Sequence, residues 1–161
     1  YRGIDTMQLA AEVVTQASQH RPDAVFVDGG GVGGGVVDRC RQLGLDVMDI
    51  NFGAKSPSPG FANMRAYMWS RMRDALREGV SLPDDADLRG ELIGVEYGYR
   101  ANNDLLLESK DDMRKRGLSS PDVADALAST YAMPVMPLSR NSYGGLTHGQ
   151  TSTADYDPFN S

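Results

Sequence analysis

The stretch AVFVDGGGVGGGVVDRCRQLGLDVMDINF, residues 24–52, decides the fold class of this chain. Its apolar start, Ala24–Asp28, predicts a buried strand, and the glycine-rich segment Gly29–Gly35 predicts a loop. A short helix over Val36–Leu43 and a second strand over Leu45–Phe52 follow. A strand, a helix and a second strand in this order predict a parallel pair with a right-handed crossover, which is typical of α/β proteins.

The rest of the chain adds helices and a hairpin around this unit. The other expected elements are helices over residues 5–18, 62–78, 83–92 and 121–132, and hairpin strands over residues 95–100 and 104–108. In the last helix, Ser120 is the expected N-cap and Pro121 the first helical residue. Residues 1–138 are therefore expected to form one domain. Residues 139–161, rich in Gly, Ser, Thr, Asn and Asp, are expected to form a flexible tail.

Composition excludes several functional classes. The 161 residues are 40% hydrophobic and 24% charged, as in an ordinary soluble globular protein, and the net charge is −6. No apolar run reaches membrane-spanning length, and no signal-peptide pattern opens the chain. The single cysteine, Cys40, forms no internal disulfide. The sequence contains no Ser–His–Asp arrangement, no zinc-ligand pattern and no Walker A motif.

The glycine loop has two competing interpretations. Gly29–Gly34 satisfies G-x-G-x-x-G after a strand and before a helix, and Asp49 lies about twenty residues beyond, as in dinucleotide-binding proteins. However, the carboxylate of Asp28, directly before the loop, would repel a pyrophosphate, and the chain offers only one such unit. A structural tight turn is therefore the preferred interpretation, and a nucleotide-binding module is the alternative.

Acidic residues at two distant positions predict a divalent-metal site. Asp28 ends a buried strand, and Asp122 and Asp125 lie on one face at the start of the last helix. Mg²⁺ and Mn²⁺ prefer oxygen ligands, and two such ions can activate water and stabilise the leaving oxygen in phosphodiester cleavage. The three acids are therefore expected to be metal ligands and catalytic residues, provided that the helix packs across the sheet.

Basic residues gather just before the acidic helix. Lys110, Arg114, Lys115 and Arg116 are expected to contact DNA phosphates, because local cations contribute to DNA affinity whatever the sign of the net charge. A second set along the helix over residues 62–78 is expected to form a solvated face. Its members are Arg65, Arg71, Arg73 and Arg77.

Three segments resemble the nuclease domain of phage terminase large subunits. They are Val25–Asp38, Asn63–Trp69 and the stretch from Glu108-Ser109-Lys110 to Asp125-Ala126-Leu127; the tail segment Asp155–Phe159 also has the look of this family's C-termini. The resemblance implies an RNase H-like α/β fold with a mixed sheet flanked by helices. It also implies a two-metal endonuclease, dependent on Mg²⁺ or Mn²⁺, that cuts concatemeric viral double-stranded DNA during packaging.

Within this resemblance, Asp28 matches the second acid of the family, Asp122 matches the third, and Asp125 is its close neighbour. The strand with the first acid and the ATPase domain would precede Tyr1, so the resemblance implies a C-terminal fragment that cuts poorly. It further implies the portal, the procapsid and the small terminase subunit as partners, no membrane, and the host cytoplasm as location. A non-catalytic docking domain of the packaging machinery remains a further alternative.

Overall fold

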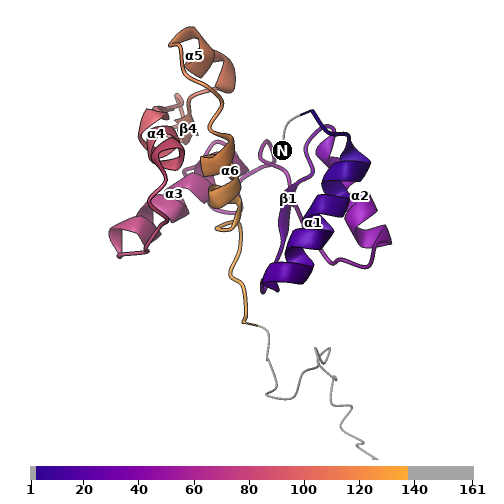
Figure 1. Cartoon of the computed structure of the whole chain (residues 1–161). Helices are drawn as coiled ribbons and strands as arrows, with labels where there is room; N and C mark the ends of the chain where they lie inside the picture. Colours follow the sequence, from indigo (N-terminus) through magenta and orange to yellow (C-terminus); the bar gives the residue numbers. More distant parts are fainter. Residues whose placement is uncertain (1–2, 138–161) are drawn as a thin grey trace, which may run out of the picture.

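The computed structural model describes residues 3–137, and their arrangement is shown in Figure 1. In chain order, the elements are α1 (Thr6–His20), β1 (Phe26–Asp28), α2 (Gly33–Gln42), β2 (Met48–Ile50), α3 (Met64–Arg77), α4 (Ala86–Gly94), β3 (Tyr97–Tyr99), β4 (Leu105–Leu107), α5 (Lys110–Lys115) and α6 (Asp122–Ser129). The expected tail over residues 139–161 lies outside the described residues, so the domain boundary stays a prediction. Within residues 3–137, no helix is long and apolar enough to cross a membrane.

The β–α–β unit is confirmed. Strands β1 and β2 pair in parallel, with Asp28 opposite Ile50, and α2 connects them. Both strands are shorter than expected. Strand β2 ends early because the Asn51 side chain accepts a hydrogen bond from the backbone N–H of Gly53 at 2.9 Å, which turns the chain away from the ladder.

The two faces of this sheet bury different clusters. Val27 packs against the cluster that α1 and α2 build around Val37 and Cys40. Phe26 packs against a second cluster, to which β2 contributes Ile50, α3 contributes Met68 and Trp69, and α6 contributes Ala124 and Ala128. Successive strand residues point to opposite faces, so this alternation separates the two layers. Figure 1 shows α1 and α2 on one side of β1 and α6 on the other.

The second half of the chain forms an antiparallel hairpin and the helices around it. Strands β3 and β4 pair with Tyr97 opposite Leu107, and Asn103 takes a left-handed conformation (φ 63°) in the turn between them. Asn tolerates this conformation, so the expected turn is confirmed. In the described residues, the parallel and antiparallel pairs are two separate sheets.

The start of α6 differs from the expectation. The N-cap is Pro121, which makes no side-chain capping bond, and the helix begins at Asp122. Ser120 does not cap the helix, because its hydroxyl donates to Oδ1 of Asp122 at 2.6 Å. The backbone N–H of Ala124, which an N-cap side chain would ordinarily bind, donates instead to Oε2 of Glu91 in α4 at 2.7 Å.

Candidate metal-binding site

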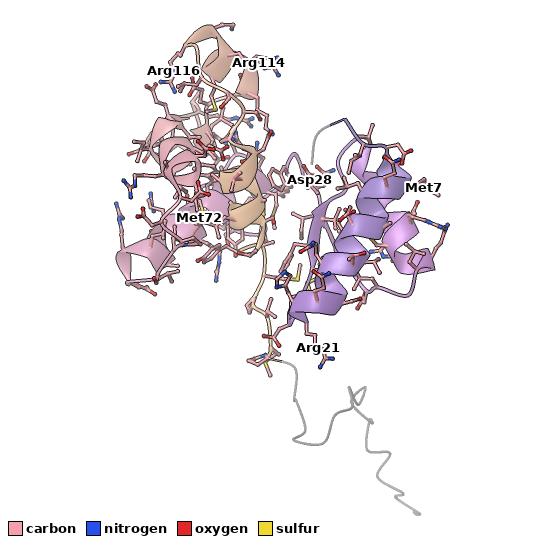
Figure 2. The ribbon with its side chains drawn as sticks, in the orientation of Figure 1. Met7, Arg21, Asp28, Met72, Arg114 and Arg116 are labelled. Atoms are coloured by element: carbon pink, nitrogen blue, oxygen red, sulfur yellow. The ribbon has the colours of Figure 1, made fainter. Side chains whose placement is uncertain are left out.

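Asp28 lies at the carboxyl end of β1, on the sheet face that packs against α6. Strand alternation places its side chain on the same face as Phe26, and its register partner Ile50 belongs to the core cluster that includes Ala124 and Ala128 of α6. Helix α6 also contacts β1 directly. Figure 2 shows Asp28 between the two halves of the molecule, where its carboxylate is exposed.

The first turn of α6 brings the other two predicted acids beside a predicted cation. Nζ of Lys110 lies 3.5 Å from Oδ1 of Asp122 and 3.2 Å from Oδ2 of Asp125. The Asp122 side chain is 58% exposed, whereas that of Asp125 is 6% exposed. Lys110, Asp122 and Asp125 therefore lie together. The Asp122 carboxylate is exposed, whereas the Asp125 carboxylate is buried.

Donors from α3 surround the buried carboxylate of Asp125. Its Oδ1 accepts hydrogen bonds from Nε of Arg65 at 2.9 Å and from Nε1 of Trp69 at 2.8 Å. The Arg65 side chain is 11% exposed, and its guanidinium carbon lies 5.7 Å from the ring centroid of Trp69. The expectation of a solvated face is therefore wrong for Arg65, because a buried carboxylate needs a charged partner and hydrogen bonds.

The donor set suits a hard divalent cation in kind, because Asp28 and Asp122 offer exposed carboxylate oxygens. In residues 3–137, however, no three acidic, histidine or cysteine side chains are placed to hold one metal ion together. Oδ2 of Asp125 is buried without a hydrogen-bond donor and faces the ammonium of Lys110. A metal site shared by the three acids thus stays a prediction. Of the three carboxylates, those of Asp28 and Asp122 are exposed.

The glycine loop is a tight turn packed against carboxylates. A Cβ on Gly33 would lie 1.8 Å from the backbone oxygen of Asp28, so only glycine lets α2 start this close to β1. A Cβ on Gly29 would lie 1.9 Å from Oδ1 of Asp49, and the N–H of Gly30 already donates to Oδ1 of Asp28 at 3.0 Å. Two carboxylates at the loop oppose an anionic phosphate, which argues against the nucleotide-binding alternative.

The predicted DNA-contacting cations are each paired with acids. Arg114 and Lys115 bind acidic residues of their own helix, Asp111 at 3.0 Å and Asp112 at 2.6 Å respectively. Arg116 instead ties α5 to the hairpin. It contacts Glu96 and Glu108, and it donates to the backbone oxygen of Gly94. Figure 2 shows Arg114 and Arg116 at the outer end of the molecule, well away from Asp28. A role in DNA binding stays a prediction for all of them.

Two residues that hold α6 in place at this site, Arg65 and Glu91, could not be identified from the sequence. The sequence pattern groups Arg65 with exposed arginines and indicates no role for Glu91. Arg65 meets Asp125 across 60 residues and Glu91 meets Ala124 across 33, so no local pattern marks either contact. One weak signal was available, since Arg65 and Trp69 lie one helical turn apart, which places them on the same face.

The fold is a mixed α/β fold of the RNase H-like class, as predicted. The expected mixed sheet is wrong for residues 3–137, because the parallel and antiparallel pairs there form two separate sheets. The fold is shared with the nuclease domain of the large terminase subunit gp2 of bacterial virus Sf6. A point variant of that domain with manganese has a TM-score of 0.64 and 22% identity, covering 83% of this chain and 76% of that chain. The domain without the substitution gives 0.60 and 24% identity, covering 78% and 72%. No protein-family model and no curated protein sequence matches the chain.

Proposed function

We propose that this chain is the nuclease domain of a large terminase subunit, a metal-dependent DNA endonuclease. One observation carries the proposal: Asp28 lies on the sheet face that packs against α6, and the first turn of α6 carries Asp122. This arrangement supports a site built from acids at a strand end and at a helix start. The shared fold supports the same conclusion, because similar structures include nuclease domains of a large terminase subunit, two of them with manganese.

In this proposal, Asp28 and Asp122 supply carboxylate ligands, and Asp125, the close neighbour of Asp122, adds a further carboxylate. Bound Mg²⁺ or Mn²⁺ would activate water and stabilise the leaving oxygen in phosphodiester hydrolysis. Lys110 holds a positive charge 3.5 Å from Asp122, where it is placed to attract a DNA phosphate. Arg114, Lys115 and Arg116, along and just beyond α5, are the further proposed phosphate contacts.

The biological substrate in this proposal is concatemeric viral double-stranded DNA, cut during genome packaging in the host cytoplasm. The portal, the procapsid and the small terminase subunit are the proposed partners. These assignments rest on the sequence resemblance and on the shared fold.

Binding of Mn²⁺, followed by electron paramagnetic resonance, is the direct test of the proposed function. We expect the wild-type chain to bind Mn²⁺, and the Asp28→Asn and Asp122→Asn variants to lose most of that binding. The matched control is Asp46→Asn. This variant removes an exposed carboxylate that precedes β2 and therefore lies at the opposite edge of the parallel sheet from Asp28.

Nicking of supercoiled plasmid in Mn²⁺ is the second readout. We expect slow nicking by the wild-type chain and less by both site variants. Equal loss of Mn²⁺ binding in Asp46→Asn, or no Mn²⁺ binding by the wild-type chain, would contradict the proposal. DNA binding without any metal binding would indicate a non-catalytic docking domain instead.

A further inference from the structure

Helix α6 carries the proposed metal ligand Asp122, but it lacks an N-terminal cap from its own segment. It is eight residues long, and its N-cap, Pro121, offers no side-chain acceptor. A helix this short is unstable alone, and the unpaired N–H groups of its first turn favour fraying. Asp122 is the first residue of that turn, so its position depends on how the turn is held.

Glu91 of α4 supplies the missing cap from a distant part of the chain. Its Oε2 accepts the backbone N–H of Ala124, the third residue of α6, at 2.7 Å. This is the donor that an N-cap side chain ordinarily binds. A carboxylate at this end also interacts favourably with the positive end of the helix dipole.

Arg65 of α3 holds the same turn from another direction. Its Nε binds Oδ1 of Asp125, and its Nη1 donates to the backbone oxygen of Glu108 at 2.9 Å. Glu108 lies two residues before Lys110, whose ammonium contacts both Asp122 and Asp125. One buried guanidinium therefore fixes α6 relative to the segment that carries Lys110.

We infer that Glu91 and Arg65 are positioning residues for Asp122. This inference rests on the proposed function, in which Asp122 binds a metal ion. The contacts that carry their influence run from Glu91 to the backbone N–H of Ala124 and from Arg65 to the Asp125 carboxylate, both in α6. Their effect passes through the backbone of α6. Groups that orient a metal ligand in this way typically change metal affinity by about 10-fold or more when they are removed.

The test compares Glu91→Ala with Glu91→Gln. Glutamine keeps a carbonyl oxygen that accepts the Ala124 N–H, whereas alanine removes the acceptor. We expect Glu91→Ala to weaken Mn²⁺ binding by about 10-fold and Glu91→Gln to retain most of it. Amide hydrogen exchange provides a readout without metal: the Ala124 N–H should lose protection in the alanine variant and keep it in the glutamine variant.

Arg65→Lys extends the test to the second contact. Lysine keeps the positive charge but lacks the planar fork that reaches Asp125 and the Glu108 carbonyl together. We expect this variant to weaken Mn²⁺ binding as Glu91→Ala does. Retention of wild-type Mn²⁺ affinity in Arg65→Lys would remove Arg65 from the inference.

Val37→Ala is the control for a general loss of stability. Val37 is buried in the cluster of α1 and α2, remote from the α6 contacts, so its truncation destabilises the chain without touching them. We expect this variant to keep wild-type Mn²⁺ affinity. Equal loss of affinity in Val37→Ala, or unchanged Ala124 exchange in Glu91→Ala, would overturn the inference. Absence of Mn²⁺ binding by the wild-type chain would overturn the proposed function, while the exchange comparison still decides whether Glu91 holds α6.

Discussion

Arg65 and Asp125 form a buried ion pair in which Nε lies 2.9 Å from Oδ1, although 60 residues separate them in the sequence. The two side chains are 11% and 6% exposed. Desolvation of such a pair is costly, so its value lies in the specific geometry it imposes. Here that geometry joins α3 to α6 beside Asp122.

Substitution of Asp125 by asparagine should destabilise the fold strongly. The change leaves the guanidinium of Arg65 buried without its counter-charge, and breaking a buried pair from one side costs about 3–5 kcal/mol. Urea unfolding measures this loss. The control Asp74→Asn removes an exposed ion pair with Arg73 and should cost less than about 1 kcal/mol. Similar losses in the two variants would show that burial does not strengthen the Arg65–Asp125 pair.

Substitution of Gly33 by alanine should destabilise the β1–α2 turn. The new methyl group would lie 1.8 Å from the backbone oxygen of Asp28, so the backbone must move, at a cost of about 1–3 kcal/mol for an overpacked site. Gly90→Ala is the control, because that helical position has open space for a Cβ and should gain about 0.5–1 kcal/mol. The melting temperatures of both variants, compared with that of the wild-type chain, measure these changes in stability. An unchanged melting temperature in Gly33→Ala would mean that the turn can move to accommodate the methyl group at little cost.

Features with a local physical cause could be predicted from the sequence. Asp5 begins α1 because it and Gln8 form a reciprocal capping box within four residues, and Asn103 marks the hairpin turn through its own backbone preference. The apolar run before Asp28 and the order of strand, helix and strand predicted the parallel pair. The positions of Asp28 at a strand end and of Asp122 at a helix start could be predicted, because each is recognisable within a few residues.

Features that depend on distant contacts could not be predicted in the same way. Ser120 has the composition of an N-cap, yet Glu91 takes that role, because α4 packs against α6 and brings its carboxylate to the Ala124 N–H. Arg65 has the pattern of a surface residue until α6 places Asp125 against it. In both cases tertiary packing outweighs local preference.

Neutralising Arg114 and Lys115 together should weaken DNA binding without unfolding the chain. Both cations pair with acids one turn earlier on α5, and such exposed pairs contribute little to stability. Loss of two phosphate contacts should reduce the slope of log affinity against log salt by about 2. Fluorescence anisotropy with duplex DNA measures the slope, and Mn²⁺ affinity should not change. Arg89→Gln, which breaks the exposed pair between Arg89 of α4 and Asp84, is the control. An equal change of the salt slope in this control would contradict a contact between α5 and DNA.

The contact between Glu108 and Arg116 makes the stability of the folded chain depend on pH. The hydrogen bond from Arg116, at 2.8 Å from Nε to Oε1, holds the pKa of Glu108 below its ordinary value of 4.5. A pKa lowered by folding means that the ionised carboxylate stabilises the folded state above the unfolded pKa, and that this contribution is lost as the pH falls through the folded pKa. Glu108→Gln should therefore melt below the wild-type chain at neutral pH.

This difference between Glu108→Gln and the wild-type chain should shrink in acid. Once Glu108 is protonated, both chains present a neutral group to Arg116, so their melting temperatures should stay apart above the ordinary pKa of 4.5 and converge as the pH falls below it. Circular dichroism measures the melting temperature of each chain as a function of pH. A gap for Glu108→Gln that stays constant down to low pH would show that shape and packing, rather than charge, join Glu108 to Arg116.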